Sequence, residues 1–121
     1  MGYNRLMDAI NFNKLTPAQS TLLARIRHSI ATNPLAVEKA VLVLFSKQDP
    51  DERRDSDTKR NNSRGFNACD ASRLSYYGRW LQGGRHFNNY HLGRARSLVG
   101  KYWRQLLVVA LAKQENLSRA A

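Results

Sequence analysis

Basic and aromatic side chains are interspersed in the C-terminal half of the chain, where residues 65–107 hold eight of the eleven aromatic residues. Guanidinium and ammonium groups form charge-assisted hydrogen bonds with phosphate oxygens, and an exposed ring stacks on an unpaired base. Six cations are candidates for phosphate contacts and two rings for base stacking: Arg73, Arg79, Arg85, Arg94, Lys101 and Arg104, with Tyr76 and Trp80.

The charge of the chain supports an anionic partner. Twenty Lys and Arg against nine Asp and Glu give the 121 residues a net charge of +11. Residues 64–121 carry ten of the basic and two of the acidic residues, whereas residues 49–63 carry four and five. A localised basic excess is the electrostatic footprint of nucleic-acid binding, although such a charge also keeps a small protein in solution. We therefore expect nucleic acid as the partner, and the candidate stacking rings favour single-stranded DNA or RNA.

Other chemistries find little support in the sequence. Cys69, His86 and His91 lack a fourth ligand at zinc-finger spacing, and a single cysteine forms no internal disulfide. The carboxylates outside 49–63 are scattered and suggest no paired acid and base: Asp8, Glu38, Asp70 and Glu115. We expect no enzyme activity, no metal and no cofactor.

Start signals define two helices in the N-terminal part. Thr16-Pro17-Ala18-Gln19 combines a capping box with a proline in the first turn, which predicts a helix over 17–32. Asn33-Pro34 repeats the signal and predicts a second helix over 34–47. That helix is apolar almost all round, so it belongs at the centre of a bundle. The residues before Thr16 leave room for a further short helix.

Residues 49–64 contain no hydrophobic side chain and predict a polar linker or long loop. Asp70 is the expected cap of a helix over 71–82 that ends at Gly83-Gly84. Asn88 is the expected cap of a long helix over 89–114, with Gly93 and Gly100 as weak points.

Together these elements predict an all-α fold, a four- to five-helix bundle with a long polar loop between its N-terminal and C-terminal helix pairs. The parts are 1–48, 49–64 and a basic helical hairpin over 65–121, within one compact domain. No apolar run approaches the roughly 18 residues of a membrane span, and no secretory signal is visible. We expect a cytoplasmic protein.

Helical periodicity divides the rings between core and surface. The helix over 71–82 has an inward face of Ala71, Leu74, Tyr77, Gly78 and Leu81, and an outward face of Arg73, Tyr76 and Trp80. Two interpretations of Trp80 stay open, because its ring is either exposed for stacking or covered by the long helix or the linker.

The long helix predicts a similar division. Its inward stripe consists of Leu92, Ala95, Val99, Tyr102, Trp103, Leu106 and Ala110. The opposite row, which has no acidic residue at i±4, consists of Arg94, Ser97, Lys101, Arg104 and Gln105. The turn GGRHFNN adds Arg85 and His86 near a helix N-terminus and predicts a phosphate cradle, and Tyr90 is a further candidate for a surface ring.

Four short runs follow one another along the chain: Leu44–Glu52; Gly65-Phe66-Asn67 with Asp70; Gly84-Arg85 with Phe87-Asn88; and Lys101-Tyr102 with Gln105-Leu106. Over residues 40–110 this pattern resembles a small helical module of bacteriophage, plasmid and bacterial proteins that also occurs beside superfamily 2 helicase regions. The module has no established activity, and its associations imply work near DNA or RNA. Tyr76 and Trp80 stand where the pattern has small or polar residues, and Asn88 replaces a Ser or Thr.

Two functional hypotheses follow. The first is a non-catalytic nucleic-acid-binding protein of a phage, plasmid or genome-defence system that holds a single-stranded or heteroduplex backbone. Size and charge are similar to those of a small CRISPR-type ribonucleoprotein subunit, an analogy of composition. The alternative is a protein-interaction module, such as an inhibitor or adaptor that docks on an acidic protein through Tyr76 and Trp80.

Overall fold

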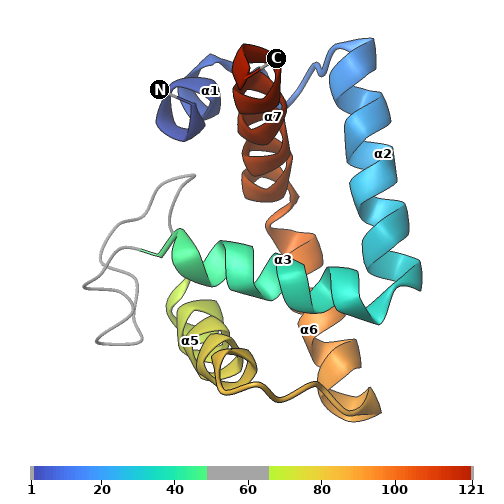
Figure 1. The fold of residues 1–121 in the computed structure, drawn as a ribbon, viewed down its shortest axis with the longest axis vertical. Coiled ribbons are helices and arrows are strands. Elements are labelled where there is room, and N and C mark those ends of the chain that lie inside the picture. The colour runs from blue at the N-terminus through green and yellow to red at the C-terminus, as the bar shows by residue number, and fades with distance from the viewer. Residues whose placement is uncertain (1, 49–65, 121) are drawn as a thin grey trace.

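Six helices make up the described part of the chain, which is residues 2–48 and 66–120 of a computed structural model (Figure 1). These ranges contain no strand, which confirms the all-α prediction. The polar linker predicted over 49–64 lies outside the described residues. In chain order the helices are α1 (Tyr3–Ala9), α2 (Pro17–Thr32), α3 (Pro34–Ser46), α5 (Ala68–Gln82), α6 (Asn89–Lys101) and α7 (Trp103–Ala120).

Local caps begin α2 and α3 as the sequence predicts. The Thr16 hydroxyl accepts from the amide of Gln19 at 3.1 Å, and the Gln19 side chain accepts from the amide of Thr16 at 3.0 Å. The Asn33 side chain accepts from the amide of Leu35 at 3.0 Å. Both caps satisfy amides that the helix itself leaves unpaired.

Helix α5 begins earlier than predicted. Its cap is Asn67, whose side chain accepts from the amide of Asp70 at 2.9 Å, so the prediction that Asp70 is the cap is wrong. Asp70 instead lies buried in the first turn. At the other end of α5, Gly84 takes the left-handed conformation with φ of 86°, whereas Gly83 does not.

The long helix predicted over 89–114 is two helices. Tyr102 interrupts it with φ of −106° and ψ of 39°, and α7 begins at the next residue. The Tyr102 hydroxyl donates to Asp70 Oδ2 at 2.6 Å, and its ring packs on Phe66 with centroids 4.7 Å apart. The side chain is thus held by residues from before α5 and from its first turn. This tertiary contact accompanies the break, which lies two residues after Gly100.

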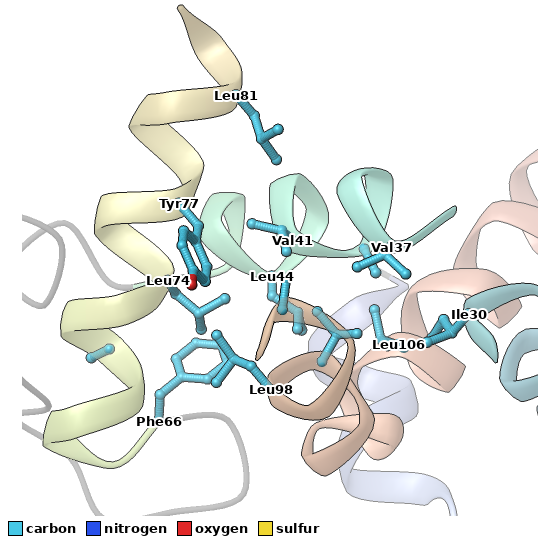
Figure 2. Packing of buried hydrophobic residues seen from close by; sticks show 14 residues of the cluster. Ile30, Val37, Val41, Leu44, Phe66, Leu74, Tyr77, Leu81, Leu98 and Leu106 are labelled. Atoms are coloured by element: carbon cyan, nitrogen blue, oxygen red, sulfur yellow. The ribbon is translucent and has the colours of Figure 1, made fainter. Parts of the chain in front are cut away.

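Helix α3 occupies the centre of the molecule, as its apolar sequence predicts. It contacts α2, α5, α6 and α7, and it meets α2 at a bend of 116°. Val37, Val41 and Leu44 pack between the buried side chains of α5 and those of α6 and α7 (Figure 2). Buried residues that precede residue 49 and buried residues that follow residue 65 therefore share one core. No single helix in the described ranges is long and apolar enough to cross a membrane.

Candidate functional site

A concave surface of about 460 Å³ lies between α5 and α6 and brings together three of the predicted cations. Arg73 enters it from α5, while Arg94 and Lys101 enter it from α6. None of its lining residues is acidic. We call this surface the basic groove and define it by its lining residues: Arg73, Tyr90, Gly93, Arg94, Ser97, Leu98 and Lys101.

Arg94 is oriented by the ring next to it. Its Nη1 donates to the Tyr90 hydroxyl at 2.7 Å, and its guanidinium lies 5.4 Å from the centroid of that ring. The hydrogen bond from Arg94 to Tyr90 raises the pKa of Arg94 above its usual value. Arg94 thus presents a permanent and partly pre-oriented charge to the groove.

Lys101 has an acidic partner, contrary to the prediction of an unneutralised row. Its Nζ lies 2.8 Å from Oδ2 of Asp70, a carboxylate that is almost fully buried. Burial on its own would raise the pKa of Asp70, but hydrogen bonds from Lys101 and Tyr102 and the charge of Lys101 hold that pKa below its usual value. More than half of the Lys101 side chain remains exposed, so its charge reaches the groove only in part.

A row of rings crosses from α5 to the start of α6. Successive ring centroids from Tyr76 to Trp80, His91 and Tyr90 are 6.2, 6.5 and 5.1 Å apart. We call these four residues the aromatic row. Tyr77 lies beneath it in the core, where its hydroxyl is 2.9 Å from Nδ1 of His91. The faces predicted for Tyr76 and Tyr77 are therefore those observed.

The two ends of the aromatic row are its most exposed members. Tyr76 is 55% exposed and Tyr90 is 64% exposed, and Tyr90 also lines the basic groove. An exposed ring beside arginine offers a face on which a base or another planar group stacks. The sequence indicated both rings as surface residues, whereas the place of His91 between them depends on how α5 and α6 each pack against α3.

Trp80 is half-buried and packs against the core. The guanidinium of Arg85 lies 4.5 Å from the centroid of its ring, and its Nε1 donates to the carbonyl oxygen of His86 at 3.3 Å. Residues of the turn between α5 and α6 thus lie against Trp80, and His91 of α6, within the long helix that the covered alternative named, lies beside it. The linker, the other cover named for Trp80, lies outside the described residues. Arg85 is consequently engaged with Trp80 at the edge of the aromatic row.

The prediction of a phosphate cradle in this turn is wrong for His86 and Phe87, because both already bind a carboxylate of the chain. Glu38 of α3 accepts from the amide of Phe87 at 3.0 Å, and its other carboxylate oxygen lies 2.8 Å from Nδ1 of His86. The Asn88 side chain accepts from the amide of His91. These donors thus face the chain's own carboxylate and amide oxygens. Glu38 is distant in sequence, so no local pattern identifies it as their partner.

Arg79 and Arg104 do not line the basic groove. Arg79 is exposed in the last turn of α5. Arg104 follows the break at Tyr102, and its guanidinium lies 5.0 Å from the ring centroid of Trp103 and 5.9 Å from that of Phe12. Gln105, predicted on the exposed row, is buried and lies in α7, beyond the break at Tyr102.

The described ranges contain no group of three or more His, Cys, Asp or Glu that could hold a metal ion. Comparison of the chain with family models, curated proteins and solved structures finds no match. The geometry of the basic groove and the aromatic row therefore carries the functional argument.

Proposed function

We propose that this chain is a non-catalytic nucleic-acid-binding protein that holds a single strand of DNA or RNA along the basic groove. The observation that carries the proposal is the convergence of Arg73, Arg94 and Lys101, from two helices, on one concave surface without an acidic lining residue. A net charge of +11 adds long-range attraction for a polyanion.

The cations and the rings have different roles in the proposed complex. Arg73 and Arg94 bind phosphate oxygens. Lys101 makes a weaker contact, because its ion pair with Asp70 partly neutralises its charge. Tyr90 at the groove and Tyr76 at the far end of the aromatic row stack on bases. Stacking needs unpaired bases, so a single strand suits this surface better than a duplex.

The setting is part of the proposal. The resemblance to a module of phage, plasmid and helicase-associated proteins and the basic composition both favour work on nucleic acid in the cytoplasm, within a mobile-element or genome-defence system. A small subunit of a larger ribonucleoprotein fits the same features. In that assembly the groove would hold the backbone while other subunits read the sequence.

Fluorescence anisotropy with labelled single-stranded DNA, single-stranded RNA and duplex DNA tests the proposal. The variant R73Q/R94Q removes two groove charges, and the matched control R25Q/K113Q removes two exposed charges from α2 and α7. At moderate salt each lost phosphate contact weakens binding severalfold, so we expect R73Q/R94Q to lose about thirtyfold in single-strand affinity. The control should lose less than about threefold. Equal losses in both variants would show that binding follows net charge and would overturn the groove as the site.

A further inference from the structure

A second concave surface, of about 400 Å³, is lined by α2, α3 and α7. Figure 1 shows α2 and α7 standing on the same side of α3. Its walls are mainly aliphatic, and several of these side chains are only partly buried. We call it the apolar groove, and its main apolar residues are Leu22, Ile26, Ile30, Val43, Leu106 and Val109.

Three cations surround the apolar groove, one from each helix. They are Arg25 of α2, Lys39 of α3 and Lys113 of α7, and all three are exposed. None of their side chains forms a hydrogen bond or an ion pair with any part of the chain that the structure describes. No acidic residue lines the groove either. An apolar floor is thus combined with uncompensated positive charge on every side.

Two of the helices that line the apolar groove also carry exposed leucines. Leu35 and Leu42 lie four residues before and three residues after Lys39, and Leu117 lies four residues after Lys113, so each shares a helix face with a groove lysine. Leu35 and Leu117 are 63% and 62% exposed. Exposed apolar side chains that gather around an apolar groove are typical of an interaction site, and these leucines share helix faces with its cations.

We propose that the apolar groove binds an acidic amphipathic helix of a partner protein. The lining residues of α2 extend from Leu22 to Ile30, which is about 12 Å of helix, or two turns. Two turns accommodate the i and i+4 anchors of an amphipathic helix laid in a groove. Carboxylates that flank such anchors would meet cations on all three walls.

The arrangement of charge disfavours other occupants. A long-chain carboxylate has one charged end, whereas the three cations come from three separate helices. A second copy of this chain brings +11 of like charge to a positive rim. Nucleic acid has little aliphatic surface to cover the leucine and isoleucine side chains. An acidic helix supplies both apolar anchors and carboxylates, so it complements the whole groove.

A designed peptide tests this proposal. The probe is an amphipathic helix of about 15 residues, the length at which isolated helices begin to form in water, with Leu at i and i+4 spacing and Glu on both flanks. Binding is followed by shifts of the Leu22, Ile26 and Val109 methyl resonances in the folded protein. A scrambled peptide of identical composition and a peptide with Lys in place of Glu are the controls.

We expect saturable shifts at the groove methyls with the Glu peptide only. The charge-reversal variant R25E/K113E should weaken this binding at least about tenfold and improve binding of the Lys peptide. R73Q/R94Q, altered in the other groove, should bind the Glu peptide like the parent. Any of three results would overturn the proposal. They are equal binding of the scrambled peptide, unchanged binding by R25E/K113E, and displacement of the Glu peptide by decanoate at a comparable concentration, below its critical micelle concentration.

Discussion

Asp70 is buried in the first turn of α5 and keeps its charge because three side chains donate to it. Lys101 and Tyr102 reach it from the end of α6, and Asn67 Nδ2 reaches it at 3.0 Å from the cap of α5. The carboxylate therefore fixes the start of one helix, the end of another and the position of a groove lysine. Burial and the hydrogen bond to Asp70 raise the pKa of Tyr102, which keeps its hydroxyl a donor.

Replacing Asp70 by Asn should lower the free energy of unfolding by about 2 kcal/mol at neutral pH, because hydrogen bonds to a charged group are lost. The pKa of Asp70 is lower in the folded protein than in the unfolded chain. Its contribution is therefore complete above about pH 4 and is lost as the pH falls through the folded value. Urea unfolding at about pH 7 and pH 3 measures both effects. A difference between parent and variant that does not narrow at the lower pH would contradict this account.

Tyr90 separates ring stacking from hydrogen bonding at the basic groove. Tyr90→Leu removes the ring, and the side chain is exposed enough for the fold to tolerate the change. We expect single-strand binding to weaken by about 1–3 kcal/mol, the usual cost of losing one base–aromatic stack. Tyr90→Phe keeps the ring and removes only the bond from Arg94, so its loss should be smaller. Anisotropy titration compares them, and similar losses in both variants would assign the effect to the hydroxyl.

At the scale of helices, Gly78 sets the distance between α5 and α3. A Cβ at this position would lie 2.4 Å from Cγ of Phe45, whose ring is buried. Gly78→Ala should therefore lower the free energy of unfolding by about 1–3 kcal/mol through overpacking, although alanine is the better helix former. Gly100→Ala in α6 is the matched control, because a Cβ there meets nothing within 4 Å. It should be neutral or stabilise by up to about 1 kcal/mol in thermal unfolding. A stabilised Gly78→Ala would contradict the close contact.

Local signals were sufficient for α2 and α3, since Thr16 and Asn33 cap them through neighbours three residues away or fewer. They were insufficient where distant residues decide. Asn67 and Asp70 are both good caps, and Asn67 caps α5 while Lys101 and Tyr102 hold the Asp70 side chain in its first turn. The same contact accompanies the break between α6 and α7.

The candidate site shows the same limit. Helix periodicity placed Tyr76 on the exposed face of α5 and Tyr77 on the buried face, because successive residues of a helix point in different directions. It did not reveal that Lys101 has an acidic partner or that Glu38 occupies the donors of the α5–α6 turn. Those partners are 31 and 49 residues away along the chain. Only the tertiary structure reveals pairs of residues that are so far apart in sequence.

For the molecule as a whole, the two proposed grooves differ in what holds a partner. The basic groove offers cations and exposed rings, and the apolar groove offers aliphatic side chains with cations around them. The five exposed large hydrophobic side chains of the described ranges divide between the helices of the two grooves, with Tyr76 and Tyr90 on α5 and α6 and three leucines on α3 and α7. Such a chain would connect a nucleic-acid strand with an acidic protein.

Salt dependence distinguishes a defined groove from diffuse attraction by +11 charges. Of the six candidate cations only Arg73, Arg94 and Lys101 line the basic groove. Each neutralised phosphate of a single strand contributes about 0.7 to the slope of log affinity against log salt. Three contacts give a slope of about −2, or roughly a hundredfold loss over a tenfold rise in salt, and R73Q/R94Q should reduce its magnitude by about 1.4. A parent slope nearer −4, unchanged in R73Q/R94Q, would mean that the strand follows other cations and that this groove is not where it binds.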